Sequence, residues 1–474
     1  MFNLETLKSN KGAIITILMV FGMVFLILLG GLLGFILLQL KESAQRVAWN
    51  ESLHVAEAGV NYYQWCINNE IEENCQREKD YYDILGNKIG GFSLEIDSNV
   101  SCGQTIQRRI LSIGHTDNFP NTQRKVSVLY ARTSVAEYAY LLNDNVWAGS
   151  DREIRGIYHS NGGVRMDGEN QSIVSSAREE WICSSSFGCD VCPISSDCRI
   201  EGNSCICPGV FTTTNNADAT LFDFPVPPFD FNGITIDLAR IKQLAQEYSV
   251  YLPPSNEIDS KGKGYHIIFK NDGSFEIRII TRLSRVWGYS LQEGWHWDYF
   301  IISSEYSYQT YPISSSCSVI FVEDNLWLEG EIKGKVTIAS ANLINPTKDT
   351  DVILPGNIDY TTRDGTDGLA VIAERNILIS PDSPDNMELR GIFIAQKGRF
   401  GRNHYLSNIR EKLEITGSIV SNKRVGTQWT SGSSIISGYL KRENYIDPKL
   451  IYNPPPFVPY TLFDFKIVNW QEVE

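Results

Sequence analysis

Six cysteines lie close together near the middle of the chain, and their thiols offer the clearest chemistry in the sequence. They are Cys183, Cys189, Cys192, Cys198, Cys205 and Cys207. An even number of cysteines in a short loop is typical of disulfides formed in an oxidising compartment. Structural zinc is the alternative, but Cys205-x-Cys207 departs from the ligand spacing that is usual in zinc sites. We therefore expect disulfides in this loop, and the sequence does not decide which cysteines pair.

Four more cysteines lie outside this loop, at Cys66, Cys75, Cys102 and Cys317. The first two flank the end of an expected helix, and Cys102 lies among expected strands. A disulfide from Cys66 to Cys75, or from Cys75 to Cys102, would tether the helix to the sheet that follows it.

Motifs of known enzyme classes are missing from the sequence. It has no G-x-S-x-G, no H-E-x-x-H and no complete phosphate-binding loop. The six histidines are scattered, and Asp364-Gly-Thr-Asp367-Gly has fewer carboxylates than a calcium loop needs. We therefore expect no catalytic residue, no resident metal and no cofactor.

Aromatic residues are densest between positions 287 and 311. Aromatic faces bind sugar rings and form the centres of protein interfaces. The candidate recognition residues, for a surface glycan or a protein ligand, are Trp287, Tyr289, Trp295, Trp297 and Tyr299. The alternative is that they pack this segment onto the rest of the protein, because Trp and Tyr are commonly mostly buried.

Length and charge limit the classes of protein to consider. The chain has 474 residues and a formal net charge of −14. Nucleic acids and anionic lipid surfaces bind clustered Lys and Arg, so an acidic chain is not expected to bind nucleic acid. A length of 474 residues allows several domains with ample core.

The N-terminal segment 13–40 contains no charged residue and predicts a single membrane-spanning helix. The helical pattern continues to about residue 69. Small residues recur there at steps of three to four, which places them on one helix face where a neighbouring helix could approach closely. These candidate helix-packing residues are Ala44, Ala48, Ser52, Ala56 and Gly59.

The N-terminus resembles the type IV pilin-like superfamily, and most closely the PilX-type minor pilins. The resemblance rests on Lys11-Gly12 before an apolar helix that begins Ala13-Ile14-Ile15, and on Ala56-Glu57-Ala58-Gly59-Val60. It implies that a prepilin peptidase cuts after Gly12 and that the new N-terminus, Ala13, is N-methylated. Most pilins carry Glu at the fifth mature position, where this chain has Ile17. That departure implies a tip or low-copy subunit rather than a repeating major subunit.

The rest of the chain reads as mainly β. Segments 92–96, 109–113 and 125–130 alternate between polar and apolar residues and predict a small antiparallel sheet. Segments 156–161, 391–396 and 417–422 each begin with glycine and end with Asn or Gln. Such repeats favour a parallel β-solenoid. A β-sandwich with coincidentally similar strands is the alternative.

The predicted fold is α+β, or mainly β, and divides into seven segments. They are a leader (1–12), a transmembrane and extended helix (13–70), a small antiparallel sheet (71–135), first solenoid strands with the Cys-rich loop 181–208 (136–233), a helix-plus-hairpin insertion with the aromatic cluster (234–316), further solenoid turns (317–445) and a Pro-rich tail (446–474).

These features predict a non-enzymatic minor pilin-like subunit. It would wait in the cell membrane and join an extracellular pilus-like filament at or near its tip, displaying its head for adhesion or assembly. Its partners would be the prepilin peptidase and other pilin-like subunits, contacted through the N-terminal helix. Two alternatives are a membrane-anchored glycan-active β-solenoid enzyme, which needs a carboxylate pair in a groove, and a static surface anchor.

Overall fold

The computed structural model describes residues 11–69, 71, 74–232, 237–345, 347–432, 434–462 and 464–473, with no side-chain description for 11–13. The chain divides into two compact units. We call them the stem unit (Met1–Asp97, Arg109–Tyr130 and Ile467–Glu474) and the head unit (Ser98–Arg108 and Ala131–Lys466). Residues 1–10 of the expected leader lie outside the described residues.

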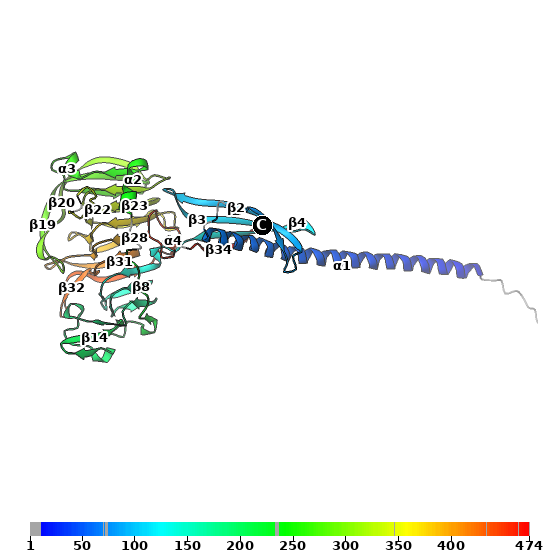
Figure 1. The fold of residues 1–474 in the computed structure, drawn as a ribbon, viewed down its shortest axis with the longest axis horizontal. Helices are drawn as coiled ribbons and strands as arrows, with labels where there is room; N and C mark the ends of the chain where they lie inside the picture. The colour runs from blue at the N-terminus through cyan, green and yellow to red at the C-terminus, as the bar shows by residue number, and fades with distance from the viewer. Residues whose placement is uncertain are drawn as a thin grey trace, which may run out of the picture. The chain divides into compact units, whose positions relative to one another are not determined.

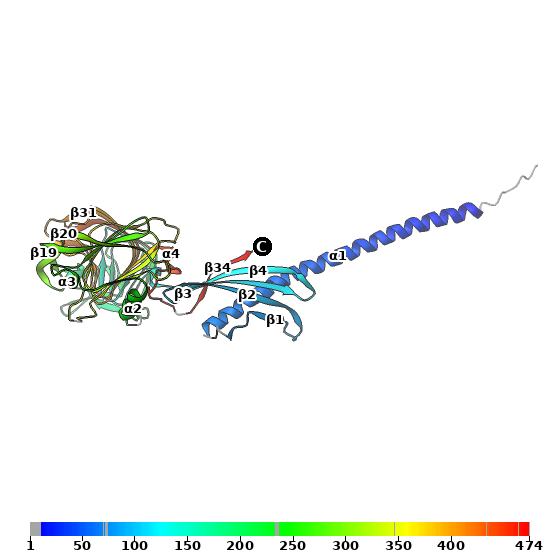
Figure 2. The same cartoon turned by 90° about the horizontal axis from the view of Figure 1, so that it is seen from above.

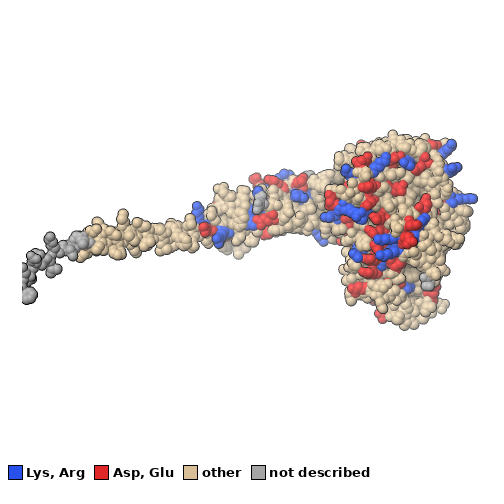
Figure 3. Space-filling view, turned by 180° about the vertical axis from the view of Figure 1, so that it is seen from behind, with Lys and Arg blue, Asp and Glu red and all other residues tan. Residues whose placement is uncertain are grey.

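The stem unit begins with one long helix, α1 (Lys11–Asn68), which contains no proline and runs without interruption (Figure 1). By length and composition it could cross a membrane from Ile14 onwards. Every described side chain from Ile14 to Val47 is exposed, and in Figure 3 the first part of this helix shows no charged side chain. The prediction of a long apolar N-terminal helix is confirmed.

A five-stranded sheet accompanies α1, in the order β1-β2-β3-β4-β34, and Figure 2 shows it clearly. Its strands are β1 (Glu78–Tyr82), β2 (Lys88–Ser101), β3 (Gln104–Thr116), β4 (Phe119–Ala131) and β34 (Lys466–Val473). The sequence predicts a Pro-rich tail over 446–474, whereas the end of that tail forms the edge strand β34. Sheet pairing overrides local composition here, because β4 offers β34 an unpaired edge.

The small residues of α1 pack against this sheet. Ala48, Ser52, Ala56 and Gly59 are buried, whereas Ala44 is exposed. The Ser52 hydroxyl donates to the carbonyl oxygen of Thr122 at 2.8 Å. The buried part of the predicted stripe therefore makes close helix–sheet contact within the chain, and its packing against sister helices stays a prediction, for which Ala44 is exposed. A Cβ atom on Gly114 of β3 would overlap the carbonyl oxygen of Ser52, which shows how close the backbones approach.

The head unit is a three-faced parallel β-helix, so the predicted solenoid is confirmed and the β-sandwich alternative is wrong. Its first face is a ladder of ten parallel strands. In spatial order they are β17 (Val250–Leu252), β21 (Val319–Val322), β23 (Lys335–Ser340), β26 (Gly368–Ala373), β28 (Asn386–Ala395), β31 (Ile409–Ser421), β5 (Tyr138–Leu142), β8 (Ile157–Ser160), β11 (Val174–Ser176) and β16 (Phe222–Asp223).

The other two faces are formed by shorter ladders. The second contains the start of β22 (Leu326–Ile332), β24 (Val352–Leu354), β27 (Ile377–Ile379) and β29 (Phe400–Gly401). The third contains the end of β22, β25 (Ile358–Tyr360), the first halves of β28 and β31, β33 (Ser434–Tyr445), β7 (Arg152–Arg155) and β10 (Glu169–Asn170). A separate three-stranded parallel sheet comprises β6 (Val146–Ala148), β9 (Val164–Met166) and β15 (Val210–Phe211).

The chain enters the β-helix in the middle of the stack. It winds from β5 to β16 at one end, crosses to β17 at the other end, and winds back until β31 pairs with β5. The colours of Figure 1 follow this path, from green through yellow and orange and then to the cyan of β8. The crossing includes α2 (Leu238–Tyr248), whose apolar face packs with Val319 and Phe321 of the first face. Two further short α-helices in the described part of the chain are α3 (Ser255–Ile258) and α4 (Pro448–Ile451).

The predicted repeats stack on one another. Gly391 and Gly417 pair directly in register, and both, like Gly156, have a positive φ where the chain turns from the third face to the first. The sequence also predicts an insertion over 234–316, yet β17 and β18 (Tyr265–Phe269) pair in parallel with solenoid strands β21 and β22. The hairpin of β19 (Ser274–Ser290) and β20 (Gly294–Pro312) extends from these paired strands as an antiparallel arm.

Candidate functional site

The β19–β20 hairpin crosses the second face of the β-helix. At its base β19 pairs with β18, and near its tip Gly288 and Tyr289 pair with β30 (His404–Tyr405). These two anchors lie on different turns, so the hairpin bridges several turns. An apolar cluster of Ile280, Trp327 and Ile353 fills the contact beneath its first half.

One side of the hairpin carries the predicted aromatic residues, which we call the aromatic strip (Trp287, Tyr289, Trp295, Trp297 and Tyr299). Trp287 lies opposite Trp297, and Tyr289 opposite Trp295, in the strand register. The rings contact one another, with Trp287 and Trp297 centroids 4.9 Å apart. Trp295 is 50% exposed and Trp297 45%, so the strip is ordered by ring contacts without being buried. The strip is therefore neither part of the buried core nor a set of freely exposed side chains.

Two aromatic residues that the sequence analysis did not single out complete the strip. His404 of β30 lies 5.3 Å from Trp295 between ring centroids, and Trp429 of β32 (Gln428–Ser431) lies 5.5 Å from Tyr289. They come from turns much later in the chain. No local pattern could have joined them to the hairpin, because only the stacking of turns brings them there.

Between the hairpin and the second face lies a trough of about 620 Å³. Its floor is made by Trp327, Ile353 and Leu378, which pair in register on successive turns. The polar and charged side chains that line it are Ser290, Gln292, Glu293, His296, Asp298, Asn325, Thr347, Lys348, Asp349, Asp351, Arg375, Asn376, Lys397, Arg399, Asn403 and Lys423. Trp297 and Tyr299 of the aromatic strip lie at its wall.

A ladder of hydrogen bonds runs from turn to turn along the trough. The backbone N–H of Asp351 donates to the side-chain oxygen of Asn325 at 2.9 Å, and that of Asn376 donates to Asp351 at 3.0 Å. The backbone N–H of Arg399 then donates to the side-chain oxygen of Asn376 at 3.0 Å. Short polar side chains satisfy the backbone at these corners, because turn residues lack strand partners. The ladder fixes the trough residues on a rigid frame.

The trough carboxylates are held by basic and hydroxyl groups. Asp351 accepts from Nε of Arg375 at 2.9 Å, and Asp349 accepts from Nζ of Lys397 at 2.7 Å. The hydrogen bond to Asp351 raises the pKa of Arg375, and the hydrogen bond to Asp349 raises the pKa of Lys397. In both pairs the carboxylate oxygens accept hydrogen bonds from a cationic side chain.

Asp298 is the most deeply buried of these carboxylates and is 4% exposed. It accepts from the Tyr405 hydroxyl at 2.9 Å and from Asn403 at 2.8 Å, and lies 2.9 Å from Nε2 of His296. Burial raises the pKa of Tyr405, which keeps that hydroxyl protonated as a donor. Each trough carboxylate in the described part of the chain thus has a polar partner. The arrangement suits binding of hydroxyl-rich groups better than proton transfer, which needs a group free to change its charge.

Arg399 differs from the other basic residues of the trough. It is 6% exposed, it donates to the side chain of Asn403, and it has no ion pair within the described residues. Burial lowers its pKa, since no carboxylate at ion-pair distance compensates its charge. It also lines a small second cavity with Arg424 and Trp429, next to the trough.

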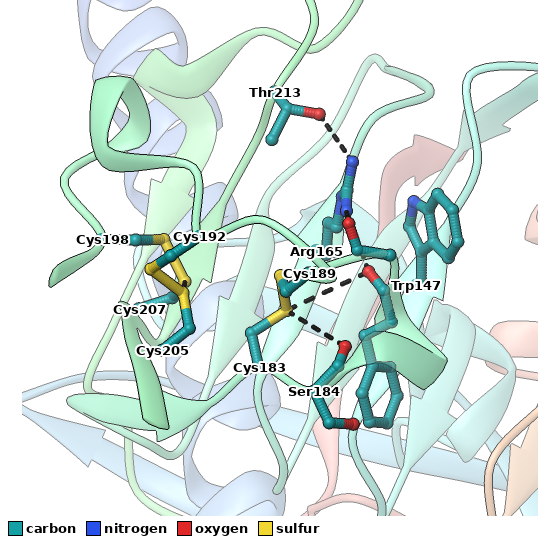
Figure 4. Close-up of a disulfide and its surroundings, with 12 residues drawn as sticks. Trp147, Arg165, Cys183, Ser184, Cys189, Cys192, Cys198, Cys205, Cys207 and Thr213 are labelled. Atoms are coloured by element: carbon teal, nitrogen blue, oxygen red, sulfur yellow. Dashed lines mark hydrogen bonds between the residues drawn. A yellow bond between two sulfur atoms is a disulfide. The ribbon is translucent and has the colours of Figure 1, made fainter. Parts of the chain in front are cut away.

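The Cys-rich loop forms three disulfides, Cys183–Cys189, Cys192–Cys205 and Cys198–Cys207 (Figure 4). It is built on strands β12 (Glu180–Ile182), β13 (Arg199–Glu201) and β14 (Ser204–Pro208). Three of its sulfur atoms, those of Cys183, Cys189 and Cys207, come close together, but all three are disulfide-bonded and cannot bind zinc as thiolates. Arg165 anchors the loop by donating to the carbonyl oxygens of Phe187 and Gly188.

The other four cysteines pair as Cys66–Cys75 and Cys102–Cys317. The first of the two alternatives from the sequence is the one observed, and the Cys75–Cys102 alternative is wrong. The processing residues Gly12 and Ala13 lie in the first turn of α1, and their side chains lie outside the description.

No protein-family model matches the chain, and no curated protein matches it. Among solved structures it is similar to the crystal structure of the competence-associated pilin ComZ from Thermus thermophilus, at 11% sequence identity and a TM-score of 0.30. The match covers 90% of this chain and 98% of that one. A likeness at this TM-score carries no functional argument. The chain's own features define its class, an apolar N-terminal helix followed by a mainly β head.

Proposed function

We propose that the protein is a non-enzymatic minor pilin-like subunit that moves from the cell membrane into an extracellular pilus-like filament. The observation that carries the proposal is the division of α1 into two parts. The part from Ile14 to Val47 is exposed, whereas one face of the later part is buried against the stem sheet. A subunit that assembles through the N-terminal part of α1 needs that part exposed for contact with neighbours. It also needs the rest of the helix held in place by its own fold.

The length of the apolar part supports assembly. The uncharged stretch 14–40 reaches about 40 Å as a helix, whereas the hydrocarbon core of a bilayer is about 30 Å thick. An upright helix therefore has about 10 Å of apolar length outside the hydrocarbon core, which is covered by other contacts or accommodated by tilting the helix. Neighbouring helices of the same kind would cover all of it, and exchanging lipid for helix contacts costs little hydrophobic free energy.

The finer parts of the proposal come from the sequence resemblance. A prepilin peptidase would cut after Gly12, Ala13 would be N-methylated, and Ile17 in place of Glu favours a tip or low-copy position. The size of the head supports that position, since a large head on every subunit would crowd the sides of a filament.

The mature N-terminus tests the proposal. Intact mass and N-terminal peptide mass spectrometry on sheared filaments and on membranes would give a chain that begins at N-methylated Ala13. An intact Met1 form that stays in the membrane and never co-purifies with filaments would overturn the proposal in favour of a static anchor.

A further inference from the structure

We propose that the trough binds an acidic polysaccharide, a sugar chain with spaced carboxylates, that lies along the axis of the β-helix. The proposal rests on the proposed function in one respect, because the head must be displayed outside the cell to meet such a polymer. It names a ligand class for the head, which the pilin-like stem leaves open.

The shape of the trough suits an extended polymer. Its residues Asn325, Asp351, Asn376, Arg399 and Lys423 come from five successive turns. At about 4.8 Å between neighbouring strands, the trough extends for about 19 Å along the axis. Its lining is mostly polar and charged, whereas pockets for compact organic ligands are mostly apolar.

The lining provides both kinds of contact that sugars make. Sugar hydroxyls can donate to the carboxylates of Asp349 and Glu293 and accept from Arg375 or Asn376. Trp297 and Tyr299 are 45% and 51% exposed at the wall and offer flat apolar surfaces. The C–H faces of sugar rings pack against such surfaces.

The charges favour an acidic sugar chain over a neutral one. Five basic residues line the trough against four acidic ones, in a chain with a net charge of −14. Lys348 and Lys423 are exposed, and neither forms an ion pair with any residue that the structure describes. Arg399 is buried without a carboxylate at ion-pair distance among the described residues, so a carboxylate of the ligand would supply the missing partner.

The same charges disfavour a nucleic acid. A nucleic acid carries a phosphate at every nucleotide, and each would approach the carboxylates of Glu293, Asp298, Asp349 and Asp351. A polysaccharide with separated carboxylates can place its charges at Arg399 and Lys423 and its hydroxyls at the acidic positions.

The test measures binding by the full-length protein in detergent micelles, using isothermal titration calorimetry. The probes are a hyaluronan hexasaccharide, which carries a carboxylate on every second sugar, as the acidic chain, cellohexaose as the neutral chain and a short oligodeoxythymidylate. We expect the hyaluronan hexasaccharide to bind more tightly than either of the others and its binding to weaken as salt is raised. Absence of hyaluronan binding, equal binding of cellohexaose, or preferred binding of the oligonucleotide would each overturn the proposal.

Substitutions locate the site. Arg399→Gln should weaken binding of the hyaluronan hexasaccharide by about tenfold or more, since a charge-assisted hydrogen bond is lost. Because Arg399 is buried, its loss could also unfold the head, so the exposed pair K348Q/K423Q provides an independent test with about threefold to tenfold weakening. Lys333→Gln, at an exposed lysine outside the trough, is the matched control and should bind like the natural chain.

Trp297→Ala tests the wall in the same way, with Tyr308→Ala as an aromatic control on the same strand outside the trough. If K348Q/K423Q and Trp297→Ala bind as well as their controls, the ligand does not lie in the trough. The N-terminus experiment distinguishes this failure from failure of the proposed function, because a chain processed to Ala13 that binds no acidic sugar overturns the trough proposal alone.

Discussion

Cys102 is bonded to Cys317 at a sequence separation of 215, and both residues belong to the head unit. Cys102 lies in the turn between β2 and β3, and Cys317 lies just before β21. The backbone N–H of Cys102 also donates to the carbonyl oxygen of Ser316 at 3.2 Å. The disulfide thus fixes a segment from early in the chain to a late turn of the β-helix.

Removing this long-range disulfide should destabilise the head. The C102S/C317S variant should lose about 5 kcal/mol of unfolding free energy, because the bond restricts a very long loop in the unfolded chain. C183S/C189S, with a sequence separation of 6, is the control and should lose only about 2 kcal/mol. Denaturant unfolding followed by tryptophan fluorescence measures both, and equal losses would contradict the expectation.

Gly417 should tolerate no side chain. Its φ is +139°, and a Cβ atom there would overlap the carbonyl oxygen of Gly391 on the neighbouring turn. Gly417→Ala should therefore lower the unfolding free energy by about 2–4 kcal/mol. Gly426→Ala is the control, since a Cβ at that position meets no atom within 4 Å. If the two variants melt at the same temperature, the corner is not constrained as described.

The stripe of small residues on α1 can be divided by substitution. Ala56 is fully buried against the stem sheet, whereas Ala44 is exposed. Ala56→Leu should overpack this contact and lower the unfolding free energy of the stem unit by about 1–3 kcal/mol. Ala44→Leu should leave stability unchanged and, if the helix assembles as proposed, should reduce incorporation into filaments. Hydrogen exchange of β3 and β4 measures the first effect, and similar protection in both variants would contradict it.

His266 should make the stability of the head depend on pH. Burial alone would lower its pKa, but its contacts with Glu305 at 2.9 Å and Glu329 at 3.3 Å outweigh burial and raise the pKa. A raised pKa in the folded state stabilises the head fully below the unfolded value, and this contribution is lost as pH rises through the folded value. His266→Gln should therefore destabilise the head more at pH 6 than at pH 9.

Comparing the two proteins at each pH separates His266 from other titrating groups. Burial lowers the pKa of Lys335 to about 8, so Lys335 also titrates over this range, but equally in both proteins. The hydrogen bonds that Glu305 makes with His266 and Arg278 outweigh its burial and lower its pKa, so it titrates below this range. Thermal melting of both proteins at several pH values measures the difference in stability between them. A constant difference between the variant and the natural chain would show that His266 does not titrate there.

Much of this architecture was predictable because local pattern decides it. In an apolar environment the backbone hydrogen-bonding groups of an uncharged run such as 14–40 are satisfied only in a helix. The segment Lys125–Tyr130 alternates between polar and apolar residues, which is the pattern of a strand in a half-buried sheet. The glycine repeats at Gly391 and Gly417 marked the solenoid, because a positive φ at these corners favours glycine and so leaves a trace in the sequence. The close run of six cysteines from Cys183 to Cys207 likewise indicated a stapled loop.

The arrangement of the turns was not predictable from such patterns. The sequence alone indicated an insertion over 234–316, but β17 and β18 find their partners much later in the chain, in β21 and β22. Similarly, the small residues from Ala48 to Gly59 fit a sister helix and a neighbouring sheet equally well. The local spacing of small residues predicts that a close contact occurs. Only the tertiary structure shows which element is the partner in that contact.

The sequence by itself therefore determined the apolar helix, the β-solenoid and the aromatic strip, because each depends on residues near one another in the chain. Only the tertiary structure decided that the chain enters the β-helix in mid-stack, which cysteines pair, and that a trough exists. The trough combines Glu293 and Asp298 of the hairpin with Asp351, Arg375 and Arg399 of separate turns. Such a site is set by the register of stacked strands, and register is a property of long-range pairing that no short segment contains.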